Sequence, residues 1–135
     1  MKTAPNPHKL LIVDDDPSVH RILAKALPPP AYQIQSAFNA QDALETLPRF
    51  QPELMILDNM MPHTSGMELL DVIRKMPAQQ NLLVLILSAK EAQADRLVGF
   101  RHGADDYVAK PFHVTHLVRK IEHMLAKTKP ETPLT

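Results

Sequence analysis

The chain has 135 residues, the length of one ordinary domain, and its 15 basic and 15 acidic side chains give a formal net charge of zero. This balance argues against a nucleic-acid-binding domain, which normally carries an excess of positive charge. The absence of cysteine excludes disulfides and thiolate metal sites. No apolar run approaches the ~20 residues that span a bilayer, and residues 1–9 contain no apolar signal segment. We therefore expect a cytoplasmic protein that does not contact membranes.

Three short apolar runs predict strands that are buried on both faces of a parallel sheet. They are residues 10–13, 54–57 and 82–87. Residues 32–37 alternate between polar and less polar side chains, and residues 107–109 form a very short segment. These two weaker segments predict strands at the edges of the sheet.

Apolar residues at helical spacing follow each predicted strand and indicate five helices. These stripes lie within residues 19–27, 40–47, 69–76, 94–98 and 114–125. Asp16 before Pro17 predicts an N-cap followed by proline at the first helical position. The thirteen prolines, Pro48 among them, stand mostly at segment edges and divide the chain into these units.

The five strand–helix units predict an α/β fold, a doubly wound (βα)5 sandwich with helices on both faces of a parallel sheet. Strand order 2-1-3-4-5, an established order for such sheets, places the three apolar strands inside and the two weaker strands at the edges. We expect one domain over residues 9–127. Residues 1–8 are predicted to be a disordered extension and residues 128–135 a tail or the end of a linker.

Acidic side chains follow the first and third predicted strands. In such sheets the functional site forms at the carboxyl ends of the strands, where the winding direction changes. Asp14, Asp15 and Asp58 should therefore converge, whereas Asp16 is better explained as a helix cap. Three close carboxylates repel one another, and a hard divalent cation such as Mg²⁺ would relieve that repulsion.

Asp58 has the chemistry of a nucleophile that forms an acyl phosphate. Phosphoryl transfer depends mainly on positioning and on neutralising the charge of the phosphoryl oxygens. Lys110 follows the fifth strand and supplies a cation, and Ser88 follows the fourth strand and supplies a hydroxyl. Either residue alone would be a weak signal, but both are expected at the same sheet edge as Asp58.

From about residue 9 to residue 127 the chain resembles the response regulator receiver domains of two-component systems, which have a flavodoxin-like fold. Several motifs carry the resemblance together, and no single one would suffice. They are LIVDDDP at 11–17, LDNMMP at 57–62, SGME at 65–68, LSA at 87–89 and GADDYVAKPF at 103–112.

The resemblance implies that Asp58 accepts a phosphoryl group from a sensor histidine kinase, a phosphotransfer protein or a small phosphodonor. It implies Mg²⁺ as the cofactor, for which Mn²⁺ or Ca²⁺ can substitute. Asp15 corresponds to a direct metal ligand and Asp14 to the acidic neighbour that holds the metal through water. The backbone carbonyl of Met60 corresponds to the third protein ligand. Such a domain catalyses its own phosphorylation and dephosphorylation and is not a turnover enzyme.

The resemblance also implies the residues that read the signal. Ser88 corresponds to the switch hydroxyl, Tyr107 to an aromatic side chain that changes rotamer with it, and Lys110 to the lysine that pairs with the phosphoryl oxygens. The peptide bond between Lys110 and Pro111 is expected to be cis.

The surface expected to change is the fourth helix, fifth strand and fifth helix, roughly residues 91–127. Its charges are most simply explained by solvation. Pairing of Asp105 or Asp106 with Lys120 across a two-fold axis would instead make a homodimer, as in some DNA-binding regulators. We expect no direct contact of this domain with nucleic acid.

Two other functions remain open at this stage. An aspartate-nucleophile phosphohydrolase would use Asp14 as the nucleophile and Asp58 as a metal ligand, but the chain has no room for a cap domain. A flavodoxin-type cofactor binder needs a hydroxyl- and glycine-rich loop after the first strand, where this chain has three aspartates.

Overall fold

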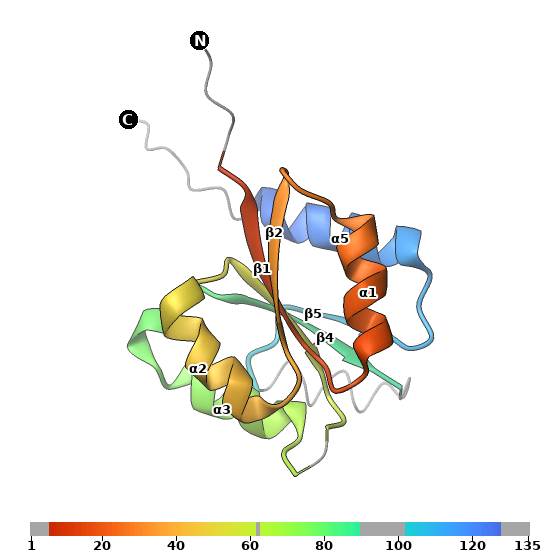
Figure 1. Ribbon diagram of the computed structural model, residues 1–135. Coiled ribbons are helices and arrows are strands. Elements are labelled where there is room, and N and C mark those ends of the chain that lie inside the picture. The colour runs from red at the N-terminus through yellow and green to blue at the C-terminus, as the bar shows by residue number, and fades with distance from the viewer. Residues whose placement is uncertain (1–5, 62, 90–101, 128–135) are drawn as a thin grey trace.

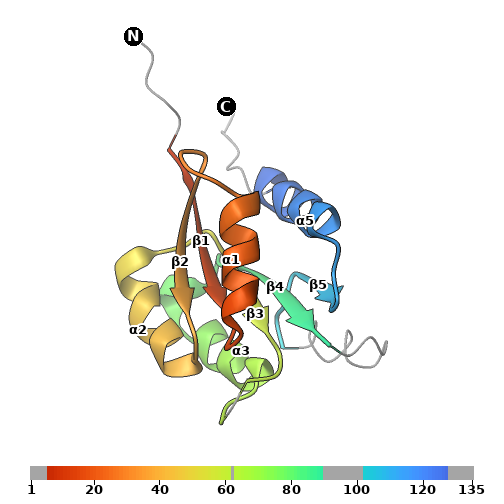
Figure 2. The same ribbon diagram turned by 45° about the vertical axis from the view of Figure 1, so that its right-hand side comes forward.

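The computed structural model describes residues 6–61, 63–89 and 102–127, and five parallel strands form its central sheet. The strand order is β2-β1-β3-β4-β5, which confirms the predicted flavodoxin-like topology and the two edge strands. In Figure 2 the arrows of β1, β3 and β4 can be followed toward the side of the sheet where the strands have their carboxyl ends. The strands are β1 (His8–Val13), β2 (Tyr32–Ala37), β3 (Leu54–Asp58), β4 (Leu83–Ser88) and β5 (Asp106–Ala109).

Helices cover both faces of this sheet, with α2 and α3 on one face and α1 and α5 on the other (Figure 1). The predicted fourth helix, at residues 94–98, lies outside the described residues. Within the described ranges, no helix has both the length and the apolar content needed to cross a membrane. The helices are α1 (Pro17–Ala26), α2 (Ala40–Phe50), α3 (Gly66–Arg74) and α5 (Val114–Lys127), with a short 3₁₀ helix η1 (Pro77–Gln79) after α3.

Two apolar clusters fill the space between the sheet and its helices. Because successive side chains of a strand point to opposite faces, Leu11 and Val13 pack toward α2 and α3, whereas Leu10 and Ile12 pack toward α1 and α5. All four side chains are fully buried. This double burial explains why the inner strands are continuous apolar runs.

Capping residues set the starts of α1 and α3. Asp16 is the predicted N-cap of α1: its carboxylate accepts hydrogen bonds from the Ser18 backbone N–H at 2.9 Å and the Ser18 hydroxyl at 2.8 Å. These two bonds lower the pKa of Asp16. Ser65 and Glu68 form a reciprocal capping box at the start of α3. Both helices therefore begin at defined residues beside the carboxyl ends of the strands.

Two predicted boundaries were wrong. Pro48 was assigned to a segment edge but lies inside α2. Proline removes one helical hydrogen bond, and the burial of Leu47 and Phe50 on either side of it keeps the last turn folded. The structured domain also begins at His8 rather than at residue 9, because the His8 N–H donates to the Ala31 carbonyl at 2.9 Å and extends the pairing of β1 with β2.

Candidate functional site

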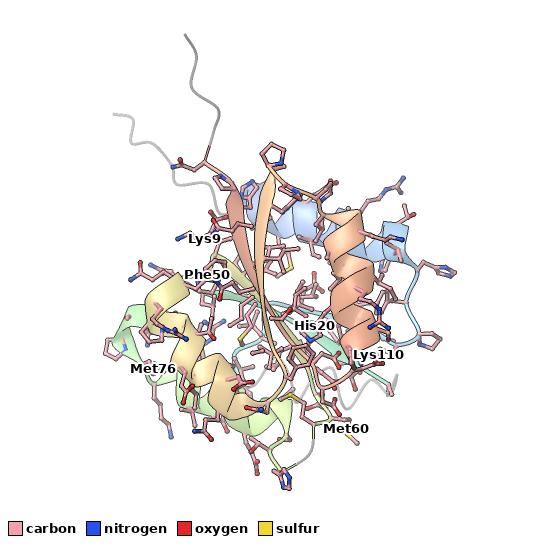
Figure 3. All side chains as sticks on the ribbon, viewed as in Figure 1. Lys9, His20, Phe50, Met60, Met76 and Lys110 are labelled. Carbon is pink, nitrogen blue, oxygen red and sulfur yellow. The ribbon has the colours of Figure 1, made fainter. Side chains whose placement is uncertain are left out.

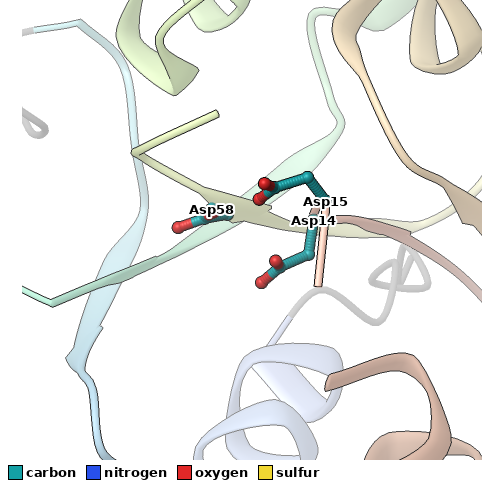
Figure 4. Close-up of side chains that lie close together, drawn as sticks. All are labelled: Asp14, Asp15 and Asp58. Atoms are coloured by element: carbon teal, nitrogen blue, oxygen red, sulfur yellow. The ribbon is translucent and has the colours of Figure 1, made fainter. Parts of the chain in front are cut away.

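Three carboxylates gather where β1 and β3 end. Asp14 and Asp15 follow β1, and Asp58 is the last residue of β3, the strand paired with β1. One oxygen of each carboxylate lies within 4.8 Å of the others (Figure 4). Asp14 is only 1% exposed and Asp58 only 4% exposed, whereas Asp15 is exposed. The predicted convergence of these residues is confirmed.

Lys110 lies between two of these carboxylates. It follows β5, and its Nζ is 3.1 Å from Asp14 Oδ2 and 3.5 Å from Asp58 Oδ1. Its backbone N–H donates to the Ser88 carbonyl at 2.7 Å, which fixes the segment to the end of β4. Burial tends to lower the pKa of Lys110, but the hydrogen bond to Asp14 and the charges of Asp58 and Asp14 outweigh it and raise the pKa. Lys110 is therefore a firmly charged cation in the cluster.

The surroundings of Asp58 disfavour the ionised form of its carboxyl group. Burial, and then repulsion by Asp14, raise its pKa from 3.8 to about 6. The charge of Lys110 and the backbone N–H of Met60, which donates to Asp58 Oδ1 at 3.3 Å, oppose this rise. At neutral pH Asp58 is thus mostly ionised but incompletely compensated, and a further cation or a change to a neutral form would relieve it.

The donor set fits a small hard divalent cation. Carboxylate oxygens are the ligands that Mg²⁺ prefers, and a Mg²⁺ site commonly uses one or two carboxylates and keeps several waters. Asp15 is exposed and can contact a hydrated ion, while the buried carboxylates of Asp14 and Asp58 add negative charge next to it. The cluster contains neither sulfur nor imidazole ligands. It is therefore chemically suited to Mg²⁺ and poorly suited to a soft metal.

The other predicted residues lie around this cluster or close to it. The Met60 backbone folds back over Asp58 through the bond just described, and its side chain is 62% exposed (Figure 3). Ser88 ends β4 at the same sheet edge and is fully buried. Tyr107 is 7% exposed and packs in the apolar cluster on the α2 and α3 face. The Lys110–Pro111 peptide bond is cis, as the resemblance implies.

Gly66 allows α3 to start close to the backbone of Asp58, a role that was not predicted from its place in the motif at residues 65–68. A Cβ atom built at Gly66 would lie 2.5 Å from the backbone oxygen of Asp58 and 2.9 Å from the Cα atom of Asn59. The Gly66 N–H also donates to the Asn59 carbonyl at 2.9 Å. Only glycine lets α3 start this close to the residues that carry Asp58. Its position directly after the capping Ser65, in a chain with three glycines, was the available signal.

The charges predicted to pair across a dimer have partners within one chain. Lys120 lies 3.4 Å from the carboxylate of Asp106. Asp105 pairs with Arg74 at 3.1 Å and also accepts the Val84 N–H at 2.9 Å. A two-fold pairing of these groups would have to exchange these partners.

Comparison with known proteins agrees with the fold. Residues 10–122 match the family model of the response regulator receiver domain. The response regulator MprA of Mycobacterium leprae (strain TN) is 35% identical over 123 residues, which make up 91% of this chain and 53% of that protein. The chain thus spans about half the length of the curated relatives that it matches.

Solved structures extend the comparison to three dimensions. The Francisella response regulator 1452 receiver domain matches with a TM-score of 0.82 at 29% identity, covering 90% of this chain and 99% of that one. The Vibrio cholerae chemotaxis protein CheY4 matches with a TM-score of 0.81 at 23% identity, over 87% of this chain and 98% of that one, which supports the fold alone. Since the family model spans most of the folded chain, the protein belongs to the response regulator receiver domains of two-component systems.

Proposed function

We propose that Asp58 accepts a phosphoryl group and that Mg²⁺ is required for the transfer. The carrying observation is the position of Asp58: a 4% exposed carboxylate at the end of β3, with Lys110 Nζ 3.5 Å away and Asp14 and Asp15 beside it. The donor is a sensor histidine kinase, a phosphotransfer protein or a small acyl phosphate. This proposal follows from membership of the family and from the chemistry of the cluster.

In the transfer, an oxygen of the ionised Asp58 carboxylate bonds to phosphorus while the bond from phosphorus to the donor atom breaks and its electron pair leaves with the donor. The product is an acyl phosphate. Without a bound cation the pKa of Asp58 is about 6, and a cation at the cluster would lower this pKa and favour the reactive ionised form. Lys110 already contacts Asp58 and would pair with the phosphoryl oxygens.

Asp14, Asp15, Asp58 and the backbone carbonyl of Met60 would hold the metal ion. When bound, Mg²⁺ neutralises negative charge on the phosphoryl oxygens and on the carboxylates. Asp14 is held by two donors, since its Oδ1 accepts the Asp16 backbone N–H at 2.9 Å and its Oδ2 accepts from Lys110. Mn²⁺ and Ca²⁺ also use oxygen ligands and would substitute.

Phosphorylation would then bias two conformations of the domain. Ser88 and Tyr107 are the proposed switch residues, and the surface that includes β5 and α5 is the proposed output face. Homodimerisation through this face stays a prediction. It would require Lys120 to leave Asp106 of its own chain and to pair with Asp105 or Asp106 of a second copy. Lys120→Glu should weaken phosphorylation-dependent dimerisation in sedimentation velocity, and unchanged sedimentation would exclude this pairing.

The proposal describes a phosphoacceptor that forms and hydrolyses its own acyl phosphate, not a turnover enzyme. A multiple-turnover phosphatase assay tests this part, and sustained release of phosphate from small phosphomonoesters would contradict it. The cytoplasmic location and the lack of direct nucleic-acid binding also stay predictions.

The central test is the gain in protein mass on incubation with acetyl phosphate and Mg²⁺. Wild type should gain one phosphoryl group, and Asp58→Asn should gain none. Asp71→Asn is the matched control, because it removes a carboxylate on α3 outside the cluster. EDTA should abolish the gain in wild type. Persistence of the gain in Asp58→Asn would refute the assignment of Asp58.

A further inference from the structure

His20 is a buried histidine on α1 that belongs to neither the acidic cluster nor the predicted switch. Its side chain is 7% exposed and points from α1 toward the ends of β1 and β2 (Figure 3). The ring of Phe38 lies against it, with 4.3 Å between the ring centroids. Phe38 is itself 41% exposed.

Both ring nitrogens of His20 have polar partners. Nε2 lies 2.8 Å from the backbone carbonyl oxygen of Asp14, and Nδ1 lies 2.8 Å from the hydroxyl of Ser36. A carbonyl oxygen can only accept a hydrogen bond, so Nε2 must carry the hydrogen. In the neutral imidazole, Nδ1 then accepts from the Ser36 hydroxyl. The ring is thus fixed in tautomer and orientation.

The bond to Asp14 acts on the peptide that joins two predicted metal ligands. The Asp14 N–H donates to the Ala37 carbonyl at 3.1 Å, and its two carboxylate oxygens accept from Asp16 and Lys110. His20 supplies the donor for the Asp14 carbonyl. This carbonyl belongs to the peptide plane between Asp14 and Asp15, so its orientation determines where the Asp15 carboxylate projects.

We propose that His20 is a positioning residue for the metal site, acting through the Asp14–Asp15 peptide. Among the described residues, only His20 is seen to donate to the carbonyl of Asp14, a residue that is 1% exposed, so loss of the Nε2–H would leave this carbonyl unpaired. A buried unpaired carbonyl is unfavourable, and the peptide would turn to find another donor. That rotation would move the Asp15 carboxylate away from Asp14 and Asp58. The inference rests on the proposed Mg²⁺-dependent phosphorylation of Asp58.

Three kinds of variant separate positioning from packing. His20→Leu and His20→Met are apolar replacements without a donor, and using both keeps the comparison valid if only one of them folds. His20→Gln retains a side-chain N–H that can reach the Asp14 carbonyl. Ser36→Ala is the matched control, because it removes the partner of Nδ1 and leaves the bond to Asp14 in place.

The primary measurement is Mg²⁺ binding to the full chain by isothermal titration calorimetry, at a temperature where circular dichroism shows each variant folded. Groups that orient metal ligands typically change metal affinity by 10- to 100-fold. We expect the apolar variants to bind Mg²⁺ about 10-fold more weakly than wild type. His20→Gln and Ser36→Ala should bind near the wild-type affinity. In phosphorylation by acetyl phosphate, the apolar variants should need more Mg²⁺ but approach the wild-type rate at saturation.

Wild-type Mg²⁺ affinity in a folded apolar variant would overturn the proposal, and so would equal losses in His20→Gln or Ser36→Ala. A loss of thermal stability with unchanged Mg²⁺ affinity would likewise overturn it, because it would show a packing role alone. Failure of the proposed function is distinct from these results: wild type would then bind Mg²⁺ without gaining a phosphoryl group on Asp58.

Discussion

Replacing Asp58 with asparagine should stabilise the metal-free protein at neutral pH, although it removes the proposed phosphorylation site. Asparagine has nearly the same shape as aspartate but carries no charge. The folded structure holds the ionised Asp58 carboxylate in a 4% exposed position beside Asp14. The neutral amide avoids both the burial of a charge and this repulsion.

The magnitude follows from the pKa of Asp58, which rises from 3.8 to about 6 on folding. This rise of about two units corresponds to about 3 kcal/mol, at ~1.4 kcal/mol per unit. The attraction of Lys110 is already included, because it acts on the same pKa. The Asp58 carboxyl binds its proton more tightly in the folded state than in the unfolded state. The contribution of Asp58 to the free energy of unfolding therefore falls as the pH rises from about 4 to about 6. The destabilisation by ionised Asp58 is complete above pH 6 and absent below 3.8, the ordinary pKa of aspartate.

The assay is urea unfolding followed by far-ultraviolet circular dichroism in EDTA, since the chain has no tryptophan. At pH 7.5 the free energy of unfolding of Asp58→Asn should exceed that of wild type by about 1–3 kcal/mol. The difference should shrink as the pH falls toward 4. Asp71→Asn serves as the control for loss of a carboxylate outside the cluster. Equal or lower stability of Asp58→Asn at pH 7.5 would refute the electrostatic account of the site.

Mg²⁺ provides a second arm of the same experiment. A ligand that binds only the folded state stabilises by RT ln(1 + [L]/Kd), which is about 1.4 kcal/mol at ten times Kd. Wild type should gain this amount, and Asp58→Asn should gain less because it has lost one proposed ligand. An equal gain in both proteins would remove Asp58 from the proposed ligand set.

Three further substitutions test the fit of Gly66 beside the site, the contacts of Arg74 before β4 and β5, and the cap of α1. Gly66→Ala places a Cβ atom 2.5 Å from the Asp58 backbone oxygen, so it should lower the free energy of unfolding by about 1–3 kcal/mol and slow phosphorylation; wild-type values of both would contradict the steric argument. Arg74→Met removes the guanidinium donors of three backbone carbonyls before β4 and β5, and the melting temperature should fall; an unchanged value would mean that water replaces them. Asp16→Ala removes the cap of α1 and should lower the melting temperature at pH 7. The difference from wild type should shrink as the pH falls through the lowered pKa of Asp16, and a difference that does not depend on pH would show that the ionised carboxylate is not the source of the stabilisation.

Local pattern was sufficient for the five strands, for the four α-helices within the described residues and for the membership of the acidic cluster. The apolar run at residues 10–13 reflects burial on both faces, and Asp16 before Pro17 is a capping signal that involves only neighbouring residues. Asp14, Asp15 and Asp58 could be placed together because parallel strands end at one edge of a sheet. Pro48 was wrongly predicted to lie at a segment edge, because its effect on α2 depends on the burial of Leu47 and Phe50, which only tertiary packing decides.

The sequence by itself thus determined which strands form, in which order they pair, and which charged residues meet at their ends. Only the tertiary structure decided how closely those groups approach. The contact of Lys110 with Asp14 joins residues 96 positions apart, and the fit of Gly66 against the Asp58 backbone depends on where α3 docks. The bond from His20 to the Asp14 carbonyl depends on how α1 packs beside β1 and β2. Periodicity records which face of an element is buried, but distances and the pKa of Asp58 depend on the packing of elements that are distant in sequence.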